Sequence, residues 1–271
     1  MFSDPYRAAV IQMNSGKDLQ NNLEQAYDYI KKANEEGALL VALPENFAFL
    51  GGLSMRMEQA DEIADQVPKF LSATADEFNI YLQGGSYPIP VGNQKVRNHA
   101  NLYGPNGEEL AGYNKIHLFD VDLSGDESYR ESDYVEAGKL ETKVCESEVI
   151  GNWGLSVCYD LRFPEFYRTL VDNGAEILSV PSAFTYTTGQ EHWEPLLRAR
   201  AIENTAYVVA AAQTGLHGKN RRTWGDAMIV DPWGTVIADA GQEPGIAMAE
   251  IDPQKLHDVR TKIPSLKHRR F

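Results

Sequence analysis

The stretch GLSVCYDLRFPE, residues 154–165, places one cysteine between the end of an apolar run and the start of a helical pattern. The run before Cys158 is typical of a buried strand, and Pro164 is typical of a first helical turn. A thiol at such a junction lies beside backbone N–H donors, which we expect to favour its thiolate. Cys158 is therefore a candidate nucleophile, although an isolated cysteine is more often a buried structural residue.

Apolar runs with the length and composition of strands recur on both sides of this stretch. They cover residues 8–13, 38–43, 80–84, 155–158, 175–181, 207–212, 227–230 and 246–251. Apolar residues at helical spacing predict helices at 19–36, 163–173 and 192–204. Strands that alternate with helices indicate an α/β protein, and strands that are apolar on both faces also fit a helix–strand–strand–helix sandwich. Because no repeat or long linker interrupts the pattern, we expect a single domain over residues 1–271.

The composition limits the kinds of partner and the cellular compartment that we expect for the protein. The chain has 271 residues, of which 43% are apolar and 24% charged, as in ordinary globular proteins. Its net charge of −14 disfavours nucleic acid and anionic membranes as partners. The N-terminus shows no signal-peptide pattern, and no run of 18 apolar residues occurs. Two cysteines are too few for a disulfide framework, so we expect a cytoplasmic protein in which Cys145, in the alternating run TKVCESEV, is structural.

Two further charged residues follow strand-like runs, at the sheet ends where functional side chains collect. Glu45 comes directly after LLVALP, residues 39–44, and Lys115 lies in GYNKIHLFD. Taken singly, each is more often a solvated residue at the end of a strand. Either Glu45 or His117 could serve as the base that a nucleophilic thiol needs. The six histidines form no metal-type pair, so we expect neither a metal ion nor another cofactor.

The three candidates lie in signatures that occur together, in this order, in one family. The signatures are LPENF around Glu45, NKIHLFD around Lys115 and GLSVCYDLRFPE around Cys158, and residues 192–215 and DPWG at 231–234 add two more. From about residue 6 to its C-terminus, the chain resembles the nitrilase superfamily of carbon–nitrogen hydrolases. This resemblance implies a four-layer αββα sandwich, a homodimer or higher homo-oligomer, and catalysis without a metal or cofactor.

The residues after the cysteine indicate a branch of this superfamily. True nitrilases usually carry Trp-Glu there, whereas this chain has Tyr159-Asp160, which favours amides over nitriles as substrates. RFPE at 162–165, the helix at 192–204 and the tail at 263–270 are most similar to the deaminated glutathione amidase branch. The ω-amidase branch, which acts on α-ketoglutaramate and succinamate, is the alternative. Two other classes are a catalytically silent binding protein on the same fold and a redox sensor that pairs Cys158 with Cys145.

The resemblance also implies roles for the three signature residues. Glu45 takes the thiol proton of Cys158, and the thiolate attacks an amide carbonyl to form a thioester. Lys115 and the backbone N–H of Tyr159 hold the oxyanion. Water activated by Glu45 then releases the acid.

The resemblance indicates the residues of the substrate pocket less directly than the three signature residues. Glu131, in the polar loop 125–138, matches a fourth residue of the family that positions Lys115 and the substrate, and Glu127 and Glu136 are alternatives in the same loop. Four residues are expected to contact a small carboxylated amide: Tyr159, Arg162, Ala183 and Phe184. Arg162 is the candidate for a substrate carboxylate, with a structural ion pair to Glu165 as its alternative.

Overall fold

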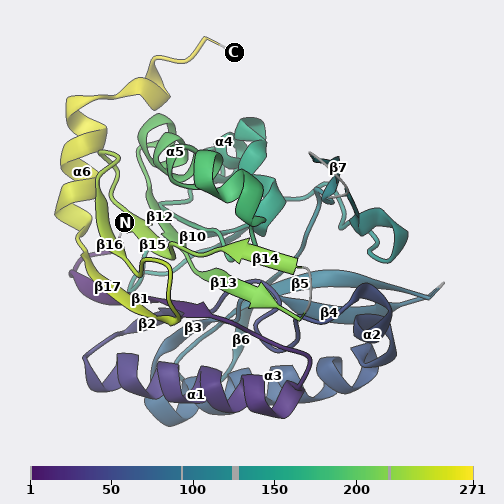
Figure 1. Ribbon diagram of the computed structural model, residues 1–271. Coiled ribbons are helices and arrows are strands. Elements are labelled where there is room, and N and C mark those ends of the chain that lie inside the picture. Colours follow the sequence, from purple (N-terminus) through teal and green to yellow (C-terminus); the bar gives the residue numbers. More distant parts are fainter. Residues whose placement is uncertain (1, 93, 124–127, 219–220, 271) are drawn as a thin grey trace.

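Alternate side chains of strand β1 (Tyr6–Met13) belong to two different apolar cores. Ala8 and Val10 pack in one core, Ala9 and Ile11 pack in the other, and all four are fully buried. Successive side chains of a strand point to opposite faces of its sheet, so β1 must be covered on both sides. The structure, a computed structural model that describes residues 2–92, 94–123, 128–218 and 221–270, shows this arrangement (Figure 1).

The larger sheet has nine strands in the described part of the chain. Its order is β14 (Arg221–Trp224), β13 (Ala212–His217), β1, β2 (Leu40–Ala42), β3 (Tyr81–Gln83), β5 (Lys95–Tyr103) and β4 (Tyr87–Val91), with β17 (Gly245–Ile251) on β1 and β6 (Glu109–Asn114) on β5. The central strands β13, β1, β2 and β3 are parallel, whereas the outer pairs are antiparallel. The ends of β2 and β6 carry the chain directly into Glu45 and Lys115.

The smaller sheet packs against the inner face of the larger one. Its order is β16 (Val236–Asp239), β15 (Met228–Val230), β12 (Tyr207–Ala210), β11 (Ile177–Ser179), β10 (Trp153–Leu155) and β9 (Lys143–Cys145). Leu155, Ile177 and Val208 from this sheet share one core with Ala8 and Val10 of β1. A separate two-stranded ribbon, β7 (Asp120–Asp122) with β8 (Ser128–Arg130), precedes Glu131.

Helices cover the outer faces of the paired sheets. α1 (Leu19–Glu35) and α3 (Ala60–Phe78) pack on the larger sheet, and α4 (Pro164–Asp172) and α5 (Tyr186–Asn204) pack on the smaller one (Figure 1). The result is the four-layer αββα sandwich that the family resemblance implied, so that expectation is confirmed. Two further α-helices occur in the described residues: α2 (Leu53–Glu58) and α6 (Pro253–Lys262).

The chain crosses between the sheets at Ala211, where the sequence predicts one continuous strand over 207–212. β12 ends at Ala210 in the smaller sheet, and β13 begins at Ala212 in the larger one. An apolar run does not reveal such a crossing, because the strands on both sides of it are buried. The predicted strand at 155–158 is displaced as well, since β10 ends at Leu155 and Cys158 lies beyond the sheet.

The structure has more helices than the sequence predicted, and one predicted helix begins earlier than expected. α1 and α4 match the predicted helices to within one residue at each end. α5 begins at Tyr186 rather than at 192, and Gly189 in its first turns packs so closely on β14 that an added Cβ would lie 2.2 Å from Trp224 Cβ. α3 and α6 were not predicted. No helix among the described residues is both long and apolar enough to cross a lipid bilayer.

Candidate active site

Cys158 lies at a sharp turn between β10 and α4. It opens the short 3-10 helix η2 (Cys158–Arg162), and its backbone has φ 46°, in the left-handed region. A non-glycine residue remains there only when its surroundings hold it. The Cys158 N–H donates to the Pro181 carbonyl at 3.0 Å, and the Val157 N–H donates to the Asp160 carboxylate at 2.8 Å. These two bonds fix the backbone on both sides of the thiol.

Asp160 is a positioning residue that the sequence analysis did not single out. Its fully buried carboxylate also accepts a hydrogen bond from the Tyr113 hydroxyl at 2.8 Å and lies 2.7 Å from His117 Nδ1. Tyr113 and His117 flank Lys115 in sequence, so Asp160 joins the lysine segment to the cysteine turn. Its place two residues after the cysteine within the signature was the available signal.

His117 does not serve as the partner of the thiol. Its ring pairs with Asp160 and stacks on Phe163 at 3.7 Å between ring centroids. The ring is not part of the pocket that Cys158 lines. The alternative of a Cys–His pair is therefore not supported, and Glu45 is the group that forms a hydrogen bond with the thiol.

Both carboxylate oxygens of Glu45 accept hydrogen bonds. Oε1 accepts from Asn98 Nδ2 at 2.8 Å and from Lys115 Nζ at 3.2 Å. Oε2 accepts from the Ala183 N–H at 2.8 Å. The segment before Glu45 packs on Gly85, which has φ +57° and where an added Cβ would lie 2.2 Å from the Pro44 carbonyl oxygen. A larger residue at that position would displace the backbone that carries Glu45.

Lys115 lies between two carboxylates and is only 2% exposed. Its Nζ donates to Glu45 and to both carboxylate oxygens of Glu131, at 3.0 and 2.9 Å. Glu131 also accepts the Phe119 N–H at 2.7 Å. The structure thus brings the expected loop residue to the lysine. Of the two alternatives, Glu136 forms an ion pair with Arg97, and Glu127 lies outside the described residues.

The charges of the cluster are set by burial and by mutual contact. Burial and the neighbouring Glu45 raise the pKa of the Cys158 thiol by more than Lys115 lowers it. Burial would raise the pKa of Glu45, but Lys115, the thiol hydrogen bond and the Ala183 N–H together hold that pKa below its usual value. Burial opposes the charge on Lys115, but Glu131 and Glu45 outweigh it and raise the Lys115 pKa. The expectation that turn amides favour a resting thiolate is therefore wrong: at neutral pH the thiol is protonated and Glu45 is ionised.

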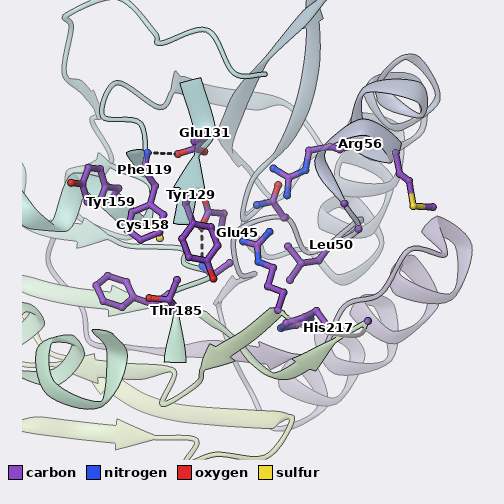
Figure 2. A pocket seen from close by; sticks show the side chains of 18 of the residues that line it. Glu45, Leu50, Arg56, Phe119, Tyr129, Glu131, Cys158, Tyr159, Thr185 and His217 are labelled. Carbon is purple, nitrogen blue, oxygen red and sulfur yellow. Dashed lines mark hydrogen bonds between the residues drawn. The ribbon is translucent and has the colours of Figure 1, made fainter. Parts of the chain in front are cut away.

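These side chains line a pocket of about 580 Å³ (Figure 2). Tyr159, Ala183 and Phe184 line it too, as the sequence analysis expected. Arg162 does not line it, which corrects the expectation for that residue. Its guanidinium carbon lies 5.2 Å from the Phe184 ring centroid, and its Nη1 lies 3.3 Å from His192 Nδ1.

Four cationic side chains of the pocket, besides Lys115, were not predicted: Lys17, Arg56, Arg221 and Arg130, the last of which pairs with Asp122. No signature connects Lys17, Arg56 and Arg221, because they come from the loop before α1, from α2 and from β14. Both cysteines are free thiols, and Cys145 is buried in β9. Within the described ranges, no group of three or more His, Cys, Asp or Glu side chains is arranged to hold a metal ion.

Comparisons with known proteins agree with this site. The sequence model of the carbon-nitrogen hydrolase family matches residues 7–261. A Synechocystis protein named deaminated glutathione amidase is 52% identical over 269 residues, covering 98% of this chain and 99% of its own. Omega-amidase NIT2 of Danio rerio is 38% identical over 269 residues, covering 98% of this chain and 95% of its own.

A solved structure gives the same result at the level of the fold. The NitFhit protein of Caenorhabditis elegans, a fusion of nitrilase and fragile histidine triad parts, aligns with a TM-score of 0.94 at 38% identity. The alignment covers 100% of this chain and 66% of that one. The fold and these matches define a hydrolase of carbon–nitrogen bonds other than peptide bonds. The chain belongs to the carbon-nitrogen hydrolase family, the nitrilase superfamily, and is one of its amidohydrolases.

Proposed function

We propose that this enzyme hydrolyses a small carboxylated amide through a thioester on Cys158. The observation that carries the proposal is the buried cluster in which Glu45 contacts both the thiol and Lys115. A protonated thiol beside an ionised carboxylate is ready for proton transfer when a substrate arrives. A binding protein without turnover has no need of this buried and costly arrangement of charges.

The first half of the reaction forms the acyl-enzyme. Glu45 takes the thiol proton, and Cys158 Sγ attacks the amide carbonyl carbon. Lys115 Nζ and the Tyr159 N–H hold the oxyanion, and each such donor contributes on the order of 3–4 kcal/mol to the stability of the transition state. The protonated Glu45 then gives its proton to the leaving nitrogen, the C–N bond breaks, and the thioester remains.

The second half releases the acid. Water enters the space that the amine has left, and Glu45 takes a proton from it as it attacks the thioester carbonyl. The C–S bond breaks, and the proton on Glu45 returns to the Cys158 sulfur. Glu131 has no direct part in these transfers and acts by holding Lys115 in place through its two hydrogen bonds.

Deaminated glutathione is the proposed substrate, on the basis of the 52% identical relative of that name. The ω-amidase substrates α-ketoglutaramate and succinamate are the second candidate, on the basis of the 38% identical relative. Deaminated glutathione and α-ketoglutaramate leave the same acyl group on the cysteine, ending in a keto acid, and they differ only in the leaving amine.

Release of α-ketoglutarate tests the choice, since both keto compounds yield it. A higher kcat/KM for deaminated glutathione than for α-ketoglutaramate would support the first assignment, and the reverse order would support ω-amidase activity. A simple nitrile and succinamate, followed by release of ammonia, complete the panel, with Cys158→Ala protein as the control. If no compound is hydrolysed, the proposed function is wrong, and a binding protein on the same fold becomes the better interpretation.

The remaining proposals concern assembly and compartment. We propose a homodimer or higher homo-oligomer, as the family resemblance implies. We place the protein in the cytoplasm, because its two free cysteines fit a reducing compartment.

A further inference from the structure

Arg56 reaches into the pocket from α2, across from Cys158 and Tyr159 (Figure 2). The residue is only 4% exposed, yet its Nε and Nη2 have no hydrogen-bond partner among the described residues. A buried guanidinium is ordinarily paired, because leaving its donors unsatisfied is costly. Two guanidinium nitrogens without a partner, on a side chain that lines a pocket, therefore indicate an anionic group of the ligand.

Arg221 lies close enough to Arg56 to repel it. Arg221 is half-buried at the start of β14, lines the same pocket and likewise has an Nε without a partner in the described ranges. Burial and the charge of Arg221 lower the pKa of Arg56 to about 10. Arg56 therefore keeps its charge at neutral pH, and its guanidinium lines the same pocket as that of Arg221.

The carboxylates of the pocket are already engaged elsewhere. Glu45 is bonded to Lys115, Asn98 and Ala183, and Glu131 to Lys115 and Phe119. Lys115 balances one of these two negative charges. Arg56 and Arg221 add two positive charges, so these five side chains together carry one net positive charge. In a protein with a net charge of −14, this local excess points to an anionic substrate.

We propose that Arg56 and Arg221 bind the carboxylate at the acyl end of the substrate and so determine specificity for carboxylated amides. This inference rests on the proposed function. The leaving amine must depart before water can attack, whereas the acyl part stays bound to Cys158. A buried pair of cations is therefore better placed to bind the acyl part than the amine. Guanidinium groups match a carboxylate with paired hydrogen bonds. Deaminated glutathione, α-ketoglutaramate and succinamate all carry a carboxylate at this end.

A pair of substrates that differ only in the carboxylate tests the proposal. Succinamate and butanamide have the same chain length, and butanamide ends in a methyl group. We expect Arg56→Met to lower the ratio of kcat/KM for succinamate over butanamide by about 10- to 100-fold, as for loss of a charge-assisted hydrogen bond, mainly through KM for succinamate. Arg56→Lys should recover part of the ratio, and Arg221→Met should lower it in the same direction.

Arg222 provides the matched control. It follows Arg221 in β14, is exposed, does not line the pocket and lies over the Tyr186 ring instead. Arg222→Met removes the same charge and should leave the succinamate-to-butanamide ratio unchanged. Thermal melting of every variant identifies any that fails to fold, and the half-buried Arg221 supplies a second variant if Arg56→Met does not fold.

Two outcomes would overturn the proposal. An equal fall in kcat/KM for both substrates in Arg56→Met would mean that Arg56 acts on the charges of Glu45 and Glu131 rather than on the substrate. An unchanged ratio would place the carboxylate elsewhere.

If the wild-type protein hydrolyses no amide, the proposed function fails separately, and calorimetry of α-ketoglutarate binding to Cys158→Ala protein decides the inference. Binding that weakens at least tenfold in the Arg56→Met, Cys158→Ala protein supports it. Binding that is unchanged, or absent from the start, contradicts it.

Discussion

Cys158 combines a left-handed backbone, at φ 46°, with a thiol buried against a carboxylate. Burial and the neighbouring Glu45 carboxylate raise the pKa of the thiol and so oppose a resting thiolate. In the proposed mechanism, the thiolate nucleophile therefore forms only after Glu45 has taken the proton. It follows that the protonation state of Glu45, and not that of a histidine, controls activity on the acid side.

The pH dependence of kcat/KM is the first prediction. The ordinary pKa values of the carboxyl, thiol and ammonium groups are 4.5, 9.0 and 10.5, and here the first is lowered while the other two are raised. Activity should fall only below pH 4.5, where Glu45 becomes protonated, and above pH 9, with a flat profile between. A rate profile measured on stable substrate checks this. An acid limb near pH 6 to 7, about where an ordinary histidine titrates, would contradict Glu45 as the base.

Glu131→Gln is the second prediction. The change removes one of the two carboxylates that raise the Lys115 pKa and weakens the hydrogen bonds that hold its Nζ. We expect kcat to fall by about 10- to 100-fold, the effect of losing a charge-assisted hydrogen bond, and the alkaline limb to move to lower pH. Glu136→Gln, in the same loop but paired with Arg97, is the control. Equal effects of the two variants on kcat would refute the positioning role.

The predicted residues that a signature surrounds lie together in one pocket, while their roles stay predictions. Glu45, Lys115 and Cys158 lie inside contiguous motifs, and the structure brings all three together with Glu131. Arg162 was assigned by its nearness to Cys158 in sequence, but its guanidinium lies over the Phe184 ring and does not line the pocket.

Arg56 and Arg221 could not be found from the sequence. They are 165 residues apart, and only the approach of α2 to β14 makes them neighbours.

At the scale of elements, Arg200 connects α5 to the cysteine turn. Its Nε and Nη2 donate to the Leu161 carbonyl in η2, at 3.1 and 2.7 Å, and its Nη1 pairs with Glu203 at 2.9 Å. Arg200 is 4% exposed. The turn that carries Cys158 is thus braced from a helix of the outer layer.

Arg200→Ala is the third prediction. It leaves the buried Leu161 carbonyl without its donors and should lower the free energy of unfolding by about 3–5 kcal/mol, with activity falling as the turn loosens. Arg198→Ala, on the same helix but half exposed, removes the surface pair with Glu194 and one hydrogen bond to the Gly234 carbonyl, and should cost about 1–2 kcal/mol. Urea denaturation of both variants measures the difference. A cost for Arg200→Ala no greater than that for Arg198→Ala would show that the brace does not stabilise the turn.

Helices and strands whose apolar residues repeat with one clear period were predictable from the sequence. Those whose limits depend on tertiary contacts were not. α1 has one apolar face and ends before Gly37, so its limits follow from the sequence. α6 was missed although Asp252 caps it, accepting from the Gln254 N–H at 2.8 Å before Pro253. The half-exposed β16 was also missed, because its apolar run is only three residues long.

At the scale of the whole molecule, the two-sheet arrangement was not determined by periodicity. Strands that are apolar on both faces fit a sheet covered by helices on both sides equally well. The resemblance to a family selected the sandwich, and the division of β1 between two cores then confirmed it. That the chain forms one domain stays a prediction.

Oligomerisation is the fourth prediction. Ile202 on α5 and Trp233 in the DPWG turn are about half exposed, and Arg198 Nε ties that turn to α5 by donating to the Gly234 carbonyl at 2.8 Å. Large apolar side chains exposed side by side are typical of an interface. Light scattering after gel filtration should give the mass of at least two chains, reduced by Trp233→Glu but not by Leu140→Glu on a separate exposed loop. A monomeric wild-type protein would contradict this.

The most direct measurement is the rate of amide hydrolysis by Cys158→Ala protein beside Cys145→Ala protein. If Cys158 forms the acyl-enzyme, its loss should lower kcat by more than about 1000-fold, whereas loss of Cys145, which lies outside the pocket, should leave kcat near the wild-type value. Circular dichroism must show both variants folded. Substantial hydrolysis by folded Cys158→Ala protein, or loss of activity in Cys145→Ala alone, would contradict the assignment of Cys158 as the nucleophile.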